Sequence, residues 1–436
     1  MVVTIFALST APGRAAVAVI RVSGPAAGEA IGVLTGTGLP APRRAVLRSL
    51  VDPQDGAVLD SGLVLWCPAP ASQSGEDMAE FHVHGGRAVI AGVMAVLARL
   101  PGMRPAEPGE FTRRAVLNGR IDLTAAEAVA DLVEADTARQ RDQALGQLAG
   151  GLEQVYDGWC DRLVALMARL EAVIDFADDD LPDDVLAGFA GDVADLRAAM
   201  AGHLGDESRA ERLREGLRVV ILGAPNVGKS SLLNQLARRD AAIVSDEAGT
   251  TRDVVEVMMD VAGFPVVLAD TAGLREDAGA IEAEGMRRAR SRAEAADLAL
   301  LVADAADWDA TWPAVEPHAG DGALIVANKS DLGITPDSGA IPISARTGQG
   351  IDTLLDAMAA RFEAAWTGHS AGPTRRRHRA HVEQALAALD RVDPGAEAAL
   401  AAEELRLAAT ALGRITGRVD VEDLLDVIFS GFCIGK

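Results

Sequence analysis

The first 118 residues carry short apolar runs of the kind that form strands, separated by turn-forming residues. The runs 16–22, 62–66 and 80–83 are rich in β-forming residues, and a longer apolar stretch over 87–100 has helical periodicity. Short strands mixed with helices are typical of a compact α+β domain. We therefore predict such a domain over residues 1–118.

Helical periodicity replaces the strand pattern after residue 118. The segment 124–127 has the spacing of a capping box, with Thr124 as the expected N-cap of a helix. Apolar residues then recur every three or four positions between 152 and 173, which is typical of one buried helical face, and similar spacing returns over 381–389 and 403–415. Two helical regions are therefore predicted, 119–216 and 367–436.

A third pattern lies between the two helical regions. From residue 217 a strand, a Gly-rich turn and a helix are followed by apolar strands at 266–269, 298–303 and 323–327. This alternation predicts a parallel α/β sheet, and we assign it to residues 217–366. Because helices flank it on both sides, the economical arrangement is one helical domain interrupted by an inserted α/β domain, whose ends would lie close together.

Composition narrows the class of protein. The chain has 436 residues, of which 49% are hydrophobic and 24% charged, so a multidomain globular protein is expected. The formal net charge of −23 would repel a polyanion, so a nucleic-acid partner needs a local basic patch. The dense basic run 375–379 is either such a phosphate contact or a solvated helix start.

The apolar runs, the basic residues and the cysteines also indicate the cellular compartment. The longest apolar run, 88–98, is shorter than the ~20 residues that a membrane-spanning helix needs. No Lys or Arg precedes Arg14, and the three cysteines lie far apart, as suits a reducing compartment. We expect a cytoplasmic protein with no membrane partner.

The sequence GAPNVGKS over 223–230 matches the phosphate-binding pattern GxxxxGK[ST] and lies between a predicted strand and a predicted helix. Its glycines allow backbone N–H groups to surround phosphate oxygens at the helix N-terminus. Lys229 would reach the β- and γ-phosphates, and the Ser230 hydroxyl would ligate Mg²⁺. The residues of this loop expected to contact the nucleotide are Asn226, Val227, Gly228, Lys229, Ser230 and Ser231.

The base is indicated about a hundred residues later by Asn328-Lys329-Ser330-Asp331. The Asp331 carboxylate can accept from guanine N1–H and from its exocyclic amine, donors that adenine lacks at those positions, so the nucleotide is predicted to be GTP. Ser344 and Ala345 stand where a backbone N–H meets guanine O6. The segment Asp270-Thr271-Ala272-Gly273 follows an apolar strand, as the Mg²⁺-side carboxylate and the γ-phosphate-sensing Gly do in GTPases.

The residue after Gly273 bears on hydrolysis. Leu274 occupies the position where Ras-like enzymes have the Gln that orients the attacking water. Glu276, Asp277, Glu282 and Glu284, which follow in the same loop, are the available substitutes, although most suit a solvated loop. The switch threonine for Mg²⁺ is Thr251 or its neighbour Thr250, and we favour Thr251.

With these residues assembled, the chain resembles the MnmE (TrmE) family of tRNA modification GTPases over essentially its whole length. The supporting segments are GAPNVGKS at 223, GTTRD at 249, DTAGLRE at 270, NKSD at 328, GEDMAEFHVHGG at 75, PGEFTRRAVLNGRIDL at 108 and FCIGK at 432. The family has an N-terminal folate-binding and dimerisation domain, a helical domain and an inserted G domain. This matches the organisation predicted above.

The resemblance implies a GTP-hydrolysing enzyme that modifies C5 of the wobble uridine of certain tRNAs. Its expected partners are a second copy bound through the N-terminal domain, the FAD-dependent protein MnmG in a heterotetramer, and tRNA. A carboxymethylaminomethyl-type group would be installed with a one-carbon unit from 5-formyltetrahydrofolate. By matching motifs, the folate-contacting residues are Arg21, Glu80, Arg120 and Lys436, with Arg120 in a position where some relatives have Lys.

The resemblance also implies a K⁺ ion beside the β- and γ-phosphates, which would neutralise developing charge as an arginine finger does. Its expected ligands are Asn226, Ser245, Glu247 and Thr250. The catalytic residues it implies are Glu282, which would position the water, Lys229, and a substrate-facing thiol at Cys433. The alternative function is a ribosome-assembly GTPase switch, although such proteins usually append an RNA-binding module and none is recognisable in this sequence.

Overall fold

A computed structural model describes residues 3–175, 186–205, 207–239, 242–243, 256–270, 296–320, 322–333, 339–366, 372–393, 397–419 and 422–435. They form two compact units. The first gathers residues from 1–130, 148–187 and 391–436, and the second gathers residues from 131–147 and 188–390.

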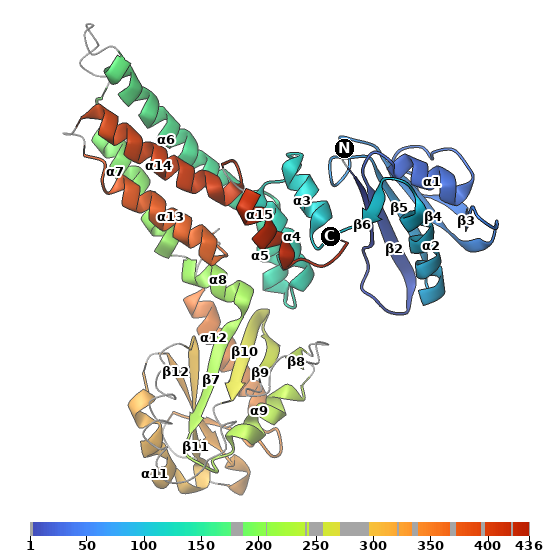
Figure 1. Cartoon of the computed structure of the whole chain (residues 1–436). Helices are drawn as coiled ribbons and strands as arrows, with labels where there is room; N and C mark the ends of the chain where they lie inside the picture. The colour runs from blue at the N-terminus through green and yellow to red at the C-terminus, as the bar shows by residue number, and fades with distance from the viewer. Residues whose placement is uncertain are drawn as a thin grey trace, which may run out of the picture. The chain divides into compact units, whose positions relative to one another are not determined.

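The N-terminal part of the first unit is an α+β domain (Figure 1). Its elements are β1 (Thr4–Leu8), β2 (Ala15–Ser23), α1 (Ala27–Thr35), β3 (Val46–Val51), β4 (Val58–Cys67), β5 (Met78–Gly85), α2 (Arg87–Arg99), β6 (Met103–Pro105) and α3 (Glu110–Leu117). The strands form a six-stranded sheet in the order β3-β4-β5-β2-β1-β6. Helices α1 and α2 pack on one face, because Ile20, Val22 and Phe81 alternate toward a core shared with Leu34 and Val96.

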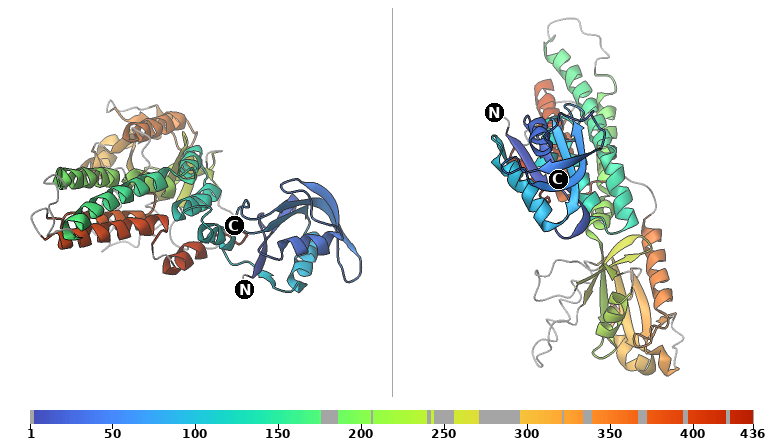
Figure 2. Two further views of the ribbon diagram at one scale, coloured as in Figure 1. Left: turned by 90° about the horizontal axis from the view of Figure 1, so that it is seen from above. Right: turned by 90° about the vertical axis from the view of Figure 1, so that its right-hand side faces the viewer.

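The helical elements of the first unit are α4 (Leu123–Glu134, divided between the units), α6 (Gly151–Asp175), α14 (Ala398–Thr416) and α15 (Glu422–Ser430). Helices α6 and α14 lie side by side (Figures 1 and 2). The predicted apolar stripe of α6 is confirmed: Leu152, Tyr156, Trp159, Leu163, Leu166 and Leu170 are buried. Tyr156 and Trp159 pack edge to face with ring centroids 5.7 Å apart.

The expected N-cap at Thr124 is wrong. Helix α4 begins at Leu123, two residues before the start that an N-cap at Thr124 implies. The Asp122 carboxylate accepts hydrogen bonds from the backbone N–H groups of Thr124 and Ala125 and from the Thr124 hydroxyl. Asp122 therefore satisfies the orphan donors of the first turn, while Thr124 is fully buried within that turn.

In the described part of the chain, the second unit contains the α/β domain together with four helices. The helices are α5 (Ala138–Leu148), α7 (Phe189–Gly205), α8 (Glu207–Glu215) and α13 (Arg376–Leu389). The α/β elements are β7 (Leu217–Gly223), α9 (Lys229–Ala237), β8 (Ala242–Ile243), β9 (Glu256–Val261), β10 (Phe264–Asp270), β11 (Leu298–Asp304), α11 (Trp308–Thr311), β12 (Ala323–Asn328), β13 (Ile341–Pro342) and α12 (Ile351–Ala365), with 3₁₀ turns η1 (Ala305–Asp307), η2 (Trp312–Ala314), η3 (Glu316–His318) and η4 (Ser330–Leu332).

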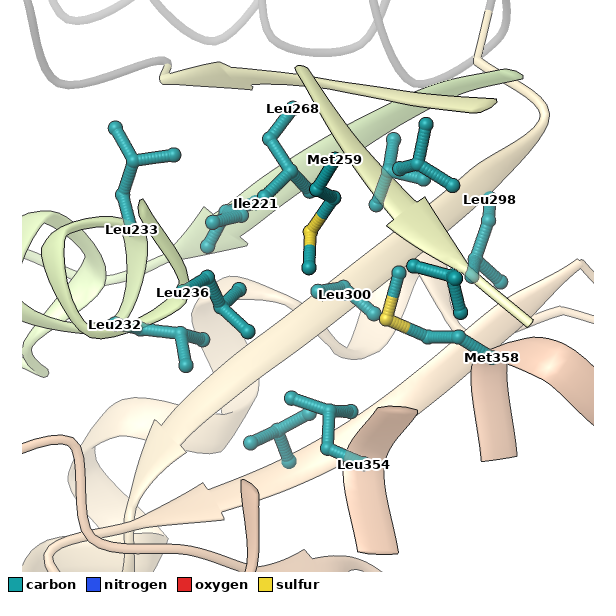
Figure 3. Close-up of a cluster of buried hydrophobic side chains, with 14 of the residues drawn as sticks. Ile221, Leu232, Leu233, Leu236, Met259, Leu268, Leu298, Leu300, Leu354 and Met358 are labelled. Atoms are coloured by element: carbon teal, nitrogen blue, oxygen red, sulfur yellow. The ribbon is translucent and has the colours of Figure 1, made fainter. Parts of the chain in front are cut away.

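The seven strands have the order β13-β12-β11-β7-β10-β9-β8. The strands from β13 to β10 run parallel, as the alternating pattern predicted, and β9 and β8 add an antiparallel edge. Leucines of α9 and α12 converge with Ile221, Leu268 and Leu300 on one face of the sheet (Figure 3). The core thereby fixes the strand ends, where loops carry the predicted nucleotide residues.

Candidate functional site

The loop between β7 and α9 has the backbone of a phosphate cradle. Asn226 and Gly228 both have positive φ angles, 62° and 100°, so the chain reverses tightly before α9 begins at Lys229. The Lys229 ammonium donates to the carbonyl oxygens of Gly223 and Ala224, each 2.9 Å away. The loop therefore brings a cation and the N–H groups of a helix N-terminus to one place, a combination that attracts phosphate.

Asn328 ties this loop to the predicted base-binding segments. Its side-chain amide donates to the Val227 carbonyl oxygen at 2.7 Å, and its side-chain oxygen accepts from the backbone N–H of Ala345 at 2.9 Å. Asn328 is only 2% exposed. Within the described residues its polar groups therefore hold the site together, a role that the motif alone did not reveal.

Asp331 lies in η4, separated from Lys329 by Ser330, and its side chain is 12% exposed. A hydrogen bond from the buried Ser344 hydroxyl, with the Arg346 guanidinium beside it, holds the pKa of the Asp331 carboxyl below its usual range. The acceptor predicted to recognise guanine is therefore ionised at neutral pH. Arg346, which is 77% exposed, forms an ion pair with the same carboxylate and competes there with any donor from a base.

The other residues predicted to bind the nucleotide are described by the structure only in part. The side chains of Ser230 and Ser231 are exposed at the start of α9. The backbone of Asp270 ends β10, in register with Ile221 of β7, so it reaches the same sheet edge as the phosphate loop. Ser245, Glu247, Thr250, Thr251, Thr271, Ala272, Gly273, Glu282 and Lys436 lie outside the described residues, so their roles stay predictions.

Two predicted folate residues form a pair on the sheet of the N-terminal domain. Arg21 of β2 and Glu80 of β5 are cross-strand partners, and the Arg21 Nε donates to Glu80 Oε1 at 3.0 Å. His82 Nε2 lies 3.1 Å from the other Glu80 oxygen. Burial works to raise the pKa of the Glu80 carboxyl, but Arg21 and His82 outweigh it and hold that pKa below its usual value.

The Arg21 and Glu80 pair is half-buried, with side chains 19% and 20% exposed. Arg21 also lies over the Phe111 ring, 5.8 Å from its centroid. Arg120 is exposed in the turn that follows α3, near Gly75. The pair thus presents a fixed carboxylate and a cation on a sheet face that α1 and α2 do not cover, which suits a ligand with both donor and anionic groups.

Sequence reasoning missed an ion network beside this pair. Arg114 donates to Glu76 at 2.8 Å and to Glu110 at 2.9 Å, and Arg104 makes two hydrogen bonds to Glu110, each 2.8 Å. The Ser23 hydroxyl also donates to Glu76 at 2.8 Å. These contacts join the segments at 75 and 108 that resembled the family, so part of that pattern reflects the packing of α3.

The C-terminal tail is held against the N-terminal domain. The Cys433 carbonyl oxygen accepts from the Gly109 N–H at 3.3 Å, and Ile434 forms a β-bridge with Pro108. The Ser9 hydroxyl donates to the Gly435 carbonyl oxygen at 2.9 Å. The Cys433 side chain is exposed, so the tail fixes the backbone of this residue while its thiol faces outward from the described residues.

Comparisons with known proteins decide the family. A model described as "GTP-binding protein TrmE N-terminus" matches residues 4–120, and one described as "MnmE helical domain" matches residues 123–433. "tRNA modification GTPase MnmE" of Paramagnetospirillum magneticum is 56% identical over 99% of both chains. The same-named proteins of Rhodospirillum rubrum (53% identical, 99% of both chains) and Parvibaculum lavamentivorans (55% identical, 99% of this chain and 100% of its own) agree.

The chain belongs to the MnmE family. The first family model spans β1 to α3, and the second begins at the first residue of α4. Among solved structures, the G domain of the T. maritima FeoB iron transporter covers 34% of this chain and 98% of its own at 23% identity, with a TM-score of 0.26. The nucleotide fold of this MnmE family member therefore rests on its own strand order and loop geometry.

The basic run at 375–379 is engaged in contacts within the second unit of this MnmE family member. Arg375 pairs with Asp131 at 2.6 Å, and Arg379 approaches Glu211 at 3.5 Å. Both carboxylates are largely buried, so they fix these arginines at the start of α13. The side chain of Arg376 is 82% exposed. Arg375 and Arg379 therefore form ion pairs within the protein, and a contact of this basic run with tRNA stays a prediction.

No helix in the described part of the chain is long and apolar enough to cross a membrane.

Proposed function

We propose that this protein hydrolyses GTP and couples the reaction to tRNA modification. The arrangement around Asn328 supports the proposal most strongly, because one buried amide joins the phosphate loop at Val227 to the base segment at Ala345. The ionised Asp331 then stands beside the joined segments as the guanine acceptor. The full-length likeness to proteins named tRNA modification GTPases supports the tRNA half of the proposal.

The chemistry that we propose is addition of a carboxymethylaminomethyl-type group at C5 of the wobble uridine, together with the FAD-dependent MnmG. A 5-formyltetrahydrofolate would bind near Arg21 and Glu80, with Arg120 and Lys436 as further contacts. Glu80 supports this assignment, because its ionised carboxylate can accept from ring N–H and amino donors of a pterin while Arg21 fixes its orientation.

Two metal ions belong to the proposal. Mg²⁺ would be held by Ser230 and Thr251, and K⁺ by Asn226, Ser245, Glu247 and Thr250. Asn226 fits this role, because its side chain is exposed and its positive φ places it on the outer bend of the phosphate loop. When bound, K⁺ would neutralise charge that develops on the phosphates, and Glu282 would orient the attacking water.

We also propose that the protein is a homodimer through the N-terminal domain and that MnmG completes a heterotetramer. The sheet supports the first contact: Leu47 of β3 and Leu63 of β4 are cross-strand partners, 64% and 41% exposed. Substituting Leu47 with Glu should convert dimers to monomers in light scattering, since a buried charge opposes association. Leu39→Glu, at a 50% exposed leucine beside α1, is the control and should leave the dimer intact.

We propose further that the protein is cytoplasmic and that its nucleotide domain is an insertion in the helical domain. The element order supports this, since α8 precedes β7 and α13 follows α12. The "MnmE helical domain" match over 123–433 also spans both sides of the nucleotide domain. Arg214 at the entry donates from Nε to the Thr374 carbonyl oxygen at the exit, 3.0 Å away, so the two crossings lie together.

The deciding experiment is nucleoside mass spectrometry of tRNA from cells that lack this protein. We expect the C5 modification of the wobble uridine to disappear and to return with wild-type protein but not with Lys229→Ala. Intact modification together with accumulated ribosomal precursors would contradict the proposal and favour a ribosome-assembly GTPase. Measuring GTP turnover by the purified wild-type protein tests the hydrolase half separately.

A further inference from the structure

Besides Asp331, a second carboxylate lies at the carboxyl ends of the strands, beside the segment predicted to bind the base. No sequence motif indicated this residue. Asp304 is the last residue of β11 and is in register with Asn328, the last residue of β12. Its Oδ2 lies 2.5 Å from the Nζ of Lys329. The side chain of Asp304 is 13% exposed and that of Lys329 is 37% exposed. A largely buried carboxylate therefore anchors the lysine that stands between Asn328 and Asp331.

The surroundings hold Asp304 in one orientation. Its Oδ1 accepts from the Ala306 N–H at 3.0 Å, and its own backbone N–H donates to the Thr311 hydroxyl at 3.0 Å. That hydroxyl donates in turn to the Asp307 carbonyl oxygen at 2.8 Å. The short segment after β11 is therefore held to Asp304 by hydrogen bonds.

Two tryptophans in the same segment pack against each other and against the sheet. Trp308 and Trp312 stack with their ring centroids 5.3 Å apart and their planes 9° from parallel. Trp312 also packs against the buried side chains on the sheet face that includes Val220 and Leu301. A carboxylate supported in this way loses little further freedom when it binds a cation, so it suits a positioning role.

We propose that Asp304 is a positioning residue of the guanine site and acts through Lys329. Lys329 adopts a positive φ of 66°, which sets its side chain off from the strand direction before Asp331 follows. With its ammonium fixed by Asp304, the apolar stem of Lys329 borders the position of the base that Asp331 recognises. Without that anchor the long side chain samples many rotamers, and nucleotide binding has to order it again.

This inference rests on the proposed GTP site and makes a distinct statement about selectivity. The Lys329 stem meets the plane of the base, whereas Asp331 meets its edge. Asp304 therefore strengthens binding of GDP and of inosine diphosphate, which lacks the exocyclic amine, by the same factor. Asp331 strengthens GDP more than inosine diphosphate, because only guanine donates from that amine.

The test is a double-mutant cycle on the full-length protein, read as the dissociation constants of GDP and inosine diphosphate. Asn at position 304 can still accept from the Ala306 N–H, so Asp304→Asn keeps the cap of η1 and removes the charge. We expect it to weaken both nucleotides about 5- to 30-fold, the cost of ordering a long side chain such as that of Lys329 on binding, with their ratio unchanged. In the Lys329→Met background the same substitution should change either constant less than about twofold.

Steady-state turnover adds a second readout. We expect Asp304→Asn to raise KM for GTP while kcat at saturation stays within about twofold of wild type, because only binding of the base is affected. The matched control is Asp309→Asn, which removes an exposed carboxylate from α11 and should leave both affinities unchanged.

Three results would overturn the inference. They are equal losses of affinity in the wild-type and Lys329→Met backgrounds, an effect no larger than that of Asp309→Asn, and a changed ratio of GDP to inosine diphosphate affinity. A wild-type protein that binds no GDP overturns the proposed function itself, so the two failures are distinguishable.

Discussion

The side-chain nitrogen of Asn328 lies 2.7 Å from the carbonyl oxygen of Val227, although the residues are 101 positions apart in the chain. The hydrogen bond joins the end of β12 to the phosphate loop after β7, two strands that are separated in the sheet by β11. Because the Asn328 side chain also accepts from the Ala345 N–H, one side chain links the phosphate loop to the base loop. A substitution that displaces one of these loops should therefore also displace the other.

Gly228→Ala should sharply weaken GTP binding. Gly228 has a φ of 100°, and an added Cβ would lie 2.3 Å from Asn328 Nδ2, so the substitution strains the loop and displaces the amide. We expect a loss of affinity of about 10-fold or more, from the cost of a left-handed non-Gly residue together with the clash. Isothermal titration calorimetry measures the loss. Gly320→Ala, at an exposed glycine with open space around it, is the control and should bind GTP normally.

Asp331→Asn should weaken GTP binding and relax guanine specificity. The ionised carboxylate accepts from two guanine donors, and an amide can accept from only one of them while its NH₂ group repels the other. We expect affinity for GTP to fall on the order of 10- to 150-fold, with a smaller loss for inosine triphosphate. Unchanged GTP affinity in calorimetry would refute the role of Asp331. Asp356→Asn, on the exposed side of α12, is the control.

GTP turnover should depend on K⁺ and on Glu282. Leu274 cannot orient water, and a cation beside the phosphates would supply the charge that an arginine finger supplies elsewhere. Replacing K⁺ with Na⁺, or Glu282 with Ala, should lower kcat much more than it weakens nucleotide binding. Equal turnover in both salts would contradict the role of the cation. Wild-type turnover by the Ala variant would contradict the role of the glutamate.

Gly435→Ala should separate tRNA modification from GTP hydrolysis. Gly435 has a φ of 96°, and an added Cβ would lie 2.2 Å from the Leu8 carbonyl oxygen, so the substitution lifts the tail from the N-terminal domain. Cys433 and Lys436 then lose their placement, whereas the nucleotide domain is untouched. We expect lost uridine modification in an assay with MnmG and normal GTP turnover.

The control for the tail is Gly431→Ala, at an exposed glycine with an ordinary backbone. It should retain both activities. A lowered melting temperature with parallel loss of both activities in Gly435→Ala would show that the tail only stabilises the fold. Normal modification by that variant would remove the tail from the mechanism.

Glu110 should make the N-terminal domain sensitive to acid. Burial works to raise the pKa of its carboxyl, but hydrogen bonds from Arg104, the Glu107 N–H and Arg114 outweigh it and lower the pKa below the ordinary 4.5. A carboxyl whose pKa is lowered by folding contributes stability above its unfolded pKa, and the contribution is lost as pH falls through the folded pKa. The domain should therefore weaken below about pH 4.5.

The variant Glu110→Gln tests this directly. At pH 7 it should reduce the free energy of unfolding by about 2 to 3 kcal/mol, because two arginines lose their common partner. The loss should shrink as pH falls. Hydrogen exchange of the amides in α3 reports the local stability, and Glu107→Gln, at an exposed neighbour, should behave as wild type. A pH-independent difference between Glu110→Gln and wild type would contradict the assignment.

The sequence by itself determined the features that depend on neighbouring residues. The phosphate-loop pattern and the alternation of strands and helices are contiguous patterns, and they predicted the β7–loop–α9 unit and the parallel strands correctly. The NKSD segment is equally contiguous, and its role toward guanine stays a prediction. The stripe of α6 was also readable, because helical periodicity alone decides which side chains share a face. The carboxylate of Asp331 likewise predicts GTP from local chemistry alone, without the fold.

Only the tertiary structure decided which distant residues meet. Asp304 reaches Lys329 because β11 and β12 pair in register, and the tail reaches Gly109 because the chain folds back on its own start. Asp122 caps α4 in place of Thr124 because the helix begins two residues earlier than the capping pattern suggested. Such contacts depend on strand register and on the path of the whole chain, and a linear pattern of residue types carries neither.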